Sequence, residues 1–591
     1  MPLADTNVGN VTQLQRLRRA IRWSRKRLNI FRENRFKMIK EYVGKHYSED
    51  GSDNKVPINM LNQAVSIYMR NLVANAPRVK TSTETLMLKD RVRSLERTIN
   101  NIIKEVRLKA TLRACAMDAL FSIGVAKVGL AESEQGNNEW RELSPGEPFC
   151  DRVSLDDFVV DMTGNDWRCL GFIGHYHRVP LDAARNNPLY DKTTREKLQP
   201  CENNWGEEGR TDKAKEISQG DNHSDDADFL QYTELLDVYL PYQNLYVVIP
   251  ATQDLDRPLV EESWLGPMRS TGPYHVLSYM DVPDNLMPSA PAQHWLDLHV
   301  ISNTIYLKSA KQAERQKDLT AFAPVAAADA QREIEAGDGE TIMTENPNGV
   351  KTVKRGGPDQ VNLGFMQISK DLFSRQANNL EVLGGLGSDA ETFGQEKLLA
   401  ESSNKVLAEM QDRVTDFTQD IVVDLGYYVW TDPVKTHRIV DEVPGLTGTV
   451  ETYLTPEDRD ADYYEFNVQI DPYSMRHESP ASKWAGVQEY LGLMGPYLPM
   501  MMQNGVVPDF EKITKLYANL RNLPELNDVM TYASGTPPEN TGQAPGMPAK
   551  TERTYNRVNK GGSTTKGKDK AIIAGLLGQN VQDAEKNLGA A

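Results

Sequence analysis

The stretch from Pro288 to Trp430 constrains the fold of this chain most, because it holds two helical patterns around a turn-rich insert, then a glycine-rich loop and a longer helical pattern. Ser289 as a capping residue and Pro291 in the first turn open the first pattern, which continues to about Lys317. The last pattern repeats apolar residues at the three- and four-residue spacing of one buried stripe, at Leu399, Val406, Met410, Val414, Phe417, Ile421, Leu425 and Tyr428. Long helices joined by an insert and a loop are more typical of a part of an assembly than of an active site.

The helix predicted over 289–317 would be roughly 40 Å long at about 1.5 Å per residue. Its second half is polar and basic, with Lys308, Lys311, Arg315 and Lys317 opposed by Glu314 and Asp318. Because such a surface contributes little to the core of a monomer, we expect this helix to pack against other copies of the chain or to face water.

The insert and the loop are marked by glycine and proline. Residues 319–362 alternate short apolar runs with turn signals, at Gly337-Asp338-Gly339, Pro347-Asn348-Gly349 and Gly356-Gly357-Pro358, which predicts a small β-rich insertion. Helical spacing returns from Phe365 to about Leu383. Gly384, Gly385 and Gly387 then tolerate positive φ, so we expect a flexible loop that reaches about Gln395.

The net charge of -16 opposes a tight, open nucleic-acid-binding surface, because such surfaces gain affinity by neutralising phosphates. An acidic channel is still compatible with it, since an acidic wall would let DNA slide while scattered lysines and arginines make weak contacts. Four cysteines at irregular spacings, with no signal-peptide pattern before them, predict synthesis in a reducing compartment: Cys115, Cys150, Cys169 and Cys201. No apolar run approaches about 18 residues, so we expect no transmembrane helix.

The remainder of the chain predicts an α+β protein that is predominantly helical. Residues 13–45 form a strongly basic helical pattern, interpreted either as a contact with DNA or an acidic partner, or as a solvated face with inter-subunit ion pairs. The other predicted elements are helices over 57–76 and 86–120, strands over 123–130, 158–160, 245–249 and 464–470, helical pieces over 480–502 and 509–532, and a disordered tail beyond Ser534.

Patterns for chemistry are weak. Cys169, His175 and His177 are residue types that bind zinc, and the two histidines would share one face of a strand, but no fourth ligand is evident. Asp458, Asp460 and Asp462 open like a calcium loop. That loop would need a glycine and a glutamate where Tyr463 and Gln469 stand, so a solvated acidic loop is favoured.

The glycines from 384 to 387 lack the lysine and hydroxyl residue of a phosphate-binding loop, and no nucleophile-elbow or zinc-protease motif is present. The sequence therefore predicts no catalytic residue, no metal and no cofactor.

Four local motifs in a fixed order carry a resemblance to a known family. They are Tyr42-Val43-Gly44 after the basic helix, Asn59 to Asn75 closed by Pro77, Asp118 with Phe121 and Gly124 before a strand, and Asp157-Phe158-Val159-Val160-Asp161. Together with the order helix, insert, helix, loop and long helix, they resemble the portal proteins of tailed bacteriophages over roughly residues 15–530. This chain departs from the family at Met69-Arg70, where many members carry a glycine.

The resemblance implies a portal-type fold with wing, stem, clip and crown. Its parts would be a wing over 1–287, a first stem helix over 288–318, a clip over 319–362, a second stem helix over 363–383, a tunnel loop over 384–395, a long wing helix and wing strand over 396–479, a crown over 480–532 and a disordered tail over 533–591. These parts would form a ring with a central channel.

The function implied by the resemblance is that of a portal in the virion, a ring commonly of twelve subunits at one capsid vertex. The ring would be assembled in the host cytoplasm, would let terminase drive double-stranded DNA in and later let it leave, and would contact capsid, scaffolding and tail adaptor proteins but no membrane. The residues implied are the stem charges Lys308, Lys311, Arg315 and Lys317, and the tunnel loop and its edge at Gly384, Gly385, Gly387, Asp389, Glu391 and Lys397.

Two other function classes stay open. A ring-forming head–tail adaptor or scaffold would share the oligomer but would not pass DNA. A metal-dependent hydrolase or nuclease would need carboxylates that converge on an ion. An axial channel wide enough for a duplex distinguishes the portal from the adaptor, and metal-dependent turnover would reveal the hydrolase.

Overall fold

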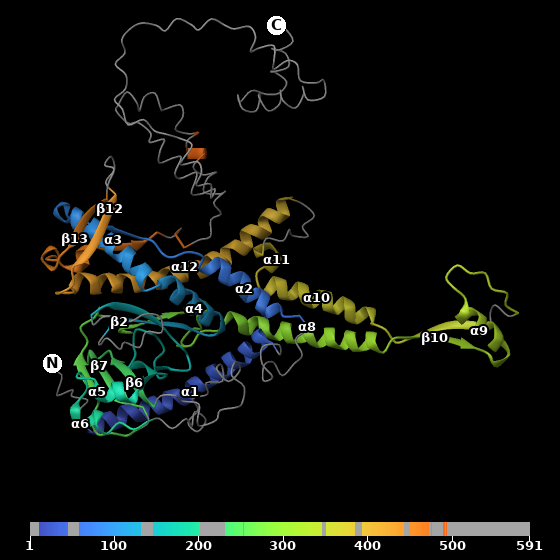
Figure 1. Cartoon of the computed structure of the whole chain (residues 1–591), viewed down its shortest axis with the longest axis horizontal. Helices are drawn as coiled ribbons and strands as arrows, with labels where there is room; N and C mark the ends of the chain where they lie inside the picture. Colours follow the sequence, from blue (N-terminus) through green and yellow to red (C-terminus); the bar gives the residue numbers. More distant parts are fainter. Residues whose placement is uncertain are drawn as a thin grey trace, which may run out of the picture. The chain divides into compact units, whose positions relative to one another are not determined.

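The structure is a computed structural model (Figure 1), which describes residues 11–44, 58–131, 146–200, 231–251, 253–345, 350–384, 393–442, 449–471, 474–475, 488–490 and 492. The strand pairs of the described residues are all antiparallel and most strands follow one another in runs between helices, so the predicted α+β class is confirmed. The elements described below belong to the unit Met1–Glu478.

The largest sheet is antiparallel and has five strands in the order β4-β5-β6-β7-β8. Its strands are β4 (Phe158–Val160), β5 (Ile173–Pro180), β6 (Tyr232–Leu240), β7 (Leu245–Pro250) and β8 (Val260–Ser263). Strand β6 is almost wholly buried because both faces of the sheet are covered. On one face helix α1 (Val11–Val43) packs Leu14 and Ile21 against Tyr176, and on the other α5 (Leu181–Asn186) packs Leu181 against Leu235.

Two arginines of the basic helix α1 are buried inside the fold. Arg32 is buried and donates to the carbonyl oxygens of Leu155 and Phe158 at 3.1 and 2.9 Å, and burial lowers the pKa of its guanidinium to about 10. Arg35 is buried between the carboxylates of Asp118 and Asp156, each at 3.2 Å. Both interpretations of this helix placed its cations outside the fold, and for these two arginines both are wrong.

A second sheet joins the helical part of the core. It consists of β3 (Pro148–Val153), β2 (Gly124–Leu130) and β9 (Tyr274–Leu277), and it packs against α4 (Leu108–Phe121) and α12 (Phe393–Thr431). The long helix predicted up to Trp430 is confirmed as α12, and its stripe enters the core through Val414, Ile421 and Leu425, each no more than 1% exposed. Also around α12 lie α2 (Met60–Leu72), α3 (Lys89–Glu105) and the strand pair β1 (Val79–Ser82) and β14 (Asn467–Ile470). The strand pair β12 (His437–Glu442) and β13 (Thr449–Leu454) packs against α3. The short helix α6 (Lys192–Arg195) lies beside the five-stranded sheet, where the Asp191 amide donates to the Leu259 carbonyl at 2.9 Å.

Residues of the family-like motifs contact one another in this core. The Asn59 side chain caps α2 by accepting from the Asn62 amide at 2.9 Å, and it donates to the Tyr42 carbonyl at 2.7 Å. The ring of Tyr42 meets that of Phe121 edge-on, with centroids 5.3 Å apart. These motif residues therefore hold α1, α2 and α4 together.

A helical hairpin made of α8 (Pro291–Glu314) and α10 (Gln360–Gln376) leaves this core, and its two helices run side by side in opposite directions (Figure 1). The chain between them forms a tip, residues 317–355. It consists of the strand pair β10 (Lys317–Phe322) and β11 (Val350–Arg355), the short helix η2 (Pro324–Ala326) and the helix α9 (Ala327–Glu335). We use "hairpin" for α8 and α10, "tip" for 317–355 and "body" for the rest of the unit.

Three predicted elements differ from the structure. The helix predicted over 86–120 is broken between α3 and α4 because Arg107 takes a left-handed conformation with φ 51°. The helix predicted over 365–383 is divided into α10 and α11 (Leu380–Leu383), with Asn378 and Asn379 at φ 59° and 55° between them. The insert contains α9 as well as strands, and the first hairpin helix ends at Glu314, so that Lys317 begins a strand.

Several predictions lie wholly or largely outside the described residues. Within the predicted loop over 384–395, the structure describes Gly384 and residues 393–395, the latter already helical in α12. Within 480–591 it describes residues 488–490 and 492. In the described part of the chain, no helix has the length and apolar character to span a bilayer.

Candidate functional site

The base of the hairpin is fixed in the body by aromatic packing. Trp295 of α8 is 3% exposed and stacks on Tyr68 of α2 with ring centroids 5.1 Å apart. Tyr68 also donates to the carbonyl of Ala377, at the end of α10, at 3.3 Å. One buried tyrosine therefore contacts both helices where they join the body.

The outer end of the hairpin is tied by a glutamine. The Gln312 side-chain oxygen of α8 accepts from the Asp359 amide at 3.2 Å and from the Asn362 side chain at 3.3 Å. The Asp359 side chain in turn caps α10 by accepting from the Val361 amide. The two helices thus enter the tip in a defined register.

Helix α10 exposes an apolar stripe. Four large apolar side chains follow the three- and four-residue spacing of one helix face and are 47% to 75% exposed: Val361, Phe365, Ile368 and Leu372. Exposed apolar patches are typical of surfaces that bind other proteins or membranes. Phe373, by contrast, is 2% exposed and belongs to the main core cluster, so α10 has one face for the body and one without a described neighbour.

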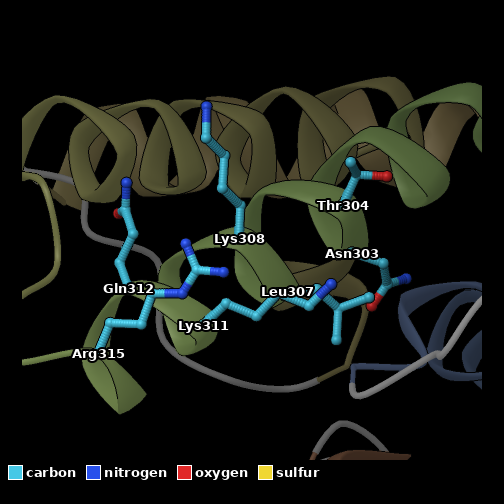
Figure 2. A pocket seen from close by; sticks show the side chains of 7 residues that line it. All are labelled: Asn303, Thr304, Leu307, Lys308, Lys311, Gln312 and Arg315. Carbon is cyan, nitrogen blue, oxygen red and sulfur yellow. The ribbon is translucent and has the colours of Figure 1, made fainter.

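Helix α8 carries a groove rich in cations. Figure 2 shows the side chains that line a pocket of about 470 Å³ along this helix: Asn303, Thr304, Leu307, Lys308, Lys311, Gln312 and Arg315. Lys308, Lys311 and Arg315 are exposed, and none of them forms an ion pair with another described residue. Like charges three and four residues apart on a helix repel one another weakly, and an anion bound between them would remove this repulsion.

The structure brings together some of the predicted site residues. Lys308, Lys311 and Arg315 line one pocket, whereas Lys317 is in β10, opposite Arg355 of β11. Gly384 follows α11, and a methyl group there would lie 3.0 Å from the Leu380 carbonyl oxygen.

The remaining predicted residues belong to the tunnel loop and its edge. Gly385, Gly387, Asp389 and Glu391 lie outside the described residues. Lys397 lies in α12, and its side chain is outside the described part of the chain.

The sequence pattern did not identify Asp237, which lies beside the two histidines predicted as possible zinc ligands. His175 and His177 share one face of β5 as predicted, and Asp237 of β6 lies next to them, whereas Cys169 is exposed and outside this group. Burial lowers the pKa of His177 although Asp237 raises it. Burial raises the pKa of Asp237, but His177 and Lys127 outweigh it, so that this carboxyl has a pKa well below its usual range. No local signal in the sequence could have joined residues so far apart, because strand pairing brings them together.

Comparison of the sequence with protein-family models and with curated proteins finds no match. The hairpin has an exposed apolar stripe on one helix and, on the other, a basic groove whose three cations form no ion pair with a described residue. Such an arrangement supports binding, to apolar surfaces through α10 and to anions through α8.

Proposed function

We propose that this chain is a portal protein of a tailed bacteriophage, which forms a closed ring of about twelve copies at one capsid vertex. DNA is packaged by terminase through the axial channel of the ring and later leaves through it, and the tip contacts tail or adaptor proteins. The order of the sequence motifs supports the family. The exposed stripe on α10 is the observation that carries the assembly.

A second copy of the same hairpin is the partner that suits this stripe best. The stripe lies on a helix that is anchored at both ends, so it cannot fold back onto its own body without breaking the Tyr68 and Gln312 contacts. Neighbouring hairpins in a ring would each present one side to the next copy, which is a heterologous contact that closes by rotation. Every stripe would then be covered, and no copy would be left with an open edge.

The groove on α8 gives the ring a charged surface of its own. Although the chain has a net charge of -16, three exposed cations follow one another along α8 and line the groove. Weak contacts between such cations and phosphates would guide DNA, while the acidic remainder of the wall would prevent tight binding. We assign Lys308, Lys311 and Arg315 to the contact with DNA.

Substituting the stripe tests this proposal. Ile368→Asp should convert the ring into monomers, because a carboxylate in a buried apolar interface lacks a partner. The free energy of unfolding of the monomer should change by no more than about 0.5 kcal/mol, since the side chain is exposed there. Light scattering measures the mass, which is 66.4 kDa for one chain and about 0.8 MDa for twelve.

The matched control is Gln367→Asp, which adds the same charge at an exposed polar position on the same helix. Rings should survive it. If Ile368→Asp leaves the mass of the assembly unchanged, or if the unsubstituted chain is a stable monomer at micromolar concentration, the stripe does not hold a ring together.

A ring-forming adaptor that does not pass DNA is the second candidate, and the same stripe supports it. The two functions differ in the groove, because an adaptor has no need of cations facing a channel. Neutralising Lys308, Lys311 and Arg315 should then impair DNA passage in a portal and leave an adaptor unaffected.

A further inference from the structure

Strands β5 and β6 bring three potential metal ligands together on the sheet face opposite α1. Asp237 is the direct cross-strand partner of His175, and His177 lies two residues further along the same face. One ligand atom from each of the three lies within 4.8 Å of the others, the one such group of histidine, cysteine and carboxylate side chains in the described part of the chain.

Two atoms of this group lack a hydrogen-bond partner among the described residues. They are Nδ1 of His177 and Oδ1 of Asp237, both buried and 3.5 Å apart. Buried polar atoms of native folds nearly always have partners, so two adjacent ones without any point to a shared ligand. Two atoms bound tetrahedrally to one metal at about 2.0–2.1 Å are roughly 3.4 Å apart, which is close to the separation seen here.

The other polar atoms of these residues are held in place. Oδ2 of Asp237 accepts from the Lys127 ammonium and from the Tyr246 hydroxyl, both at 2.7 Å. Nδ1 of His175 lies 2.9 Å from the Tyr274 hydroxyl. The two tyrosine hydroxyls orient the carboxylate and the ring, as the outer partners of metal ligands do in known sites, whereas the Lys127 ammonium adds a positive charge beside the carboxylate.

We infer that His175, His177 and Asp237 bind a divalent transition metal, with Zn²⁺ as the ion that this donor set suits best. Two imidazoles and one carboxylate are a donor set used by zinc and related ions, and water can complete the coordination. The metal ties β5 to β6 within the large sheet. The His177 side chain is 17% exposed, so part of this ring lies at the surface although its Nδ1 atom is buried.

Lys127 distinguishes a metal site from a cluster of ion pairs. Its ammonium is bonded to the same carboxylate, so it repels a bound cation and weakens the site. If the three residues bind a metal, Lys127→Gln should therefore raise their affinity for it. If they are instead held together only by ion pairs, Lys127→Gln removes the main ion-pair partner of Asp237 and should not raise the affinity for any metal.

The test is titration of the chelator-treated full chain with Co²⁺, followed by calorimetry and by the visible absorption of the ion, whose intensity reports its geometry. We expect about one ion per chain and a tetrahedral spectrum. His177→Gln should weaken binding by more than tenfold. Lys127→Gln should strengthen it, and His294→Gln, a change at an exposed histidine on α8, should leave it unaltered.

Circular dichroism of each variant with chelator present shows whether the fold is intact. If His177→Gln does not fold, the spectrum of the unsubstituted chain and the Lys127→Gln affinity decide the matter. An unsubstituted chain that binds no Co²⁺ would overturn the inference. So would binding that His177→Gln leaves at full strength, or a Lys127→Gln variant whose affinity falls.

Discussion

The body and the hairpin of this chain differ in where their charged and apolar side chains lie. In the body, the buried Arg35 forms ion pairs with two buried carboxylates, and one of these, Asp118, also pairs with Arg152. On the hairpin, large apolar side chains of α10 and three cations of α8 face outward. The comparison shows that buried charges of the body are paired within the fold, whereas the hairpin has apolar side chains and cations that no described residue covers or pairs.

The largest effect that this comparison predicts is the loss of stability in Arg35→Met. The substitution leaves the Asp118 and Asp156 carboxylates facing an apolar side chain, and breaking a buried pair of this kind costs roughly 3–5 kcal/mol. The free energy of unfolding, measured by urea denaturation, should fall by about that amount.

Arg22→Met is the matched control, because it makes the same change on the same helix at an exposed pair. Arg22 and Asp254 are 59% and 66% exposed, so their contact contributes about 0–1 kcal/mol. Equal losses in both variants would mean that burial does not separate the interior arginines of α1 from the surface ones.

The triple substitution Lys308→Gln, Lys311→Gln and Arg315→Gln tests the other half of the comparison. It should leave the free energy of unfolding nearly unchanged, since these side chains are exposed and form no ion pair with a described residue. The assembled protein should bind short DNA duplexes more weakly. The salt dependence of the binding constant should flatten by roughly 0.9 for each lost phosphate contact.

Three exposed cations of α3 provide the control: Lys89→Gln, Arg93→Gln and Lys104→Gln together remove the same charge from the body. Binding and salt dependence measured by fluorescence anisotropy should differ between the two triple variants. If they change alike, net charge rather than the groove governs the contact with DNA.

The smallest predicted effect is a pH dependence that belongs to the body alone. Burial, followed by the charges of Arg459 and Lys435, lowers the pKa of His437 in β12 from 6.5 to about 4. The unfolded chain therefore binds more protons between these values, so this histidine lowers stability as pH falls from about 6.5 toward 4. Because His437 is partly exposed, we expect a loss of about 1 kcal/mol rather than the full value that the shift implies.

His437→Gln should remove this component, so that its free energy of unfolding falls less on acidification than that of the unsubstituted chain. His294→Gln, at an exposed histidine, should not. Urea denaturation at several pH values measures the difference. Parallel pH profiles for the unsubstituted chain and His437→Gln would show that the proton is taken up elsewhere.

Periodicity predicted the parts of the fold whose stripes are regular. The apolar repeat of α12 led directly to the buried Val414, Ile421 and Leu425. It could not predict the break at Arg107, because an arginine in a left-handed conformation gives no glycine or proline signal. The pair Asn378-Asn379 is a better signal, since asparagine tolerates positive φ more readily.

The candidate site was predicted in part for a similar reason. The cations of α8 are neighbours in sequence, so helical spacing alone placed Lys308, Lys311 and Arg315 on one surface. Helical spacing was predicted only from Phe365, so the sequence did not predict the stripe of α10, which begins at Val361 and whose exposure depends on what the body covers. Arg35 and Asp237 depend on contacts between distant segments, and a local pattern cannot show such contacts.

Electron microscopy of the purified full chain tests the central claim most directly. The account predicts closed rings of about twelve copies, with the hairpins of neighbouring copies in contact and an axial channel wide enough for a DNA duplex. Particles without a channel, or a chain that stays monomeric at micromolar concentration and moderate salt, would contradict it.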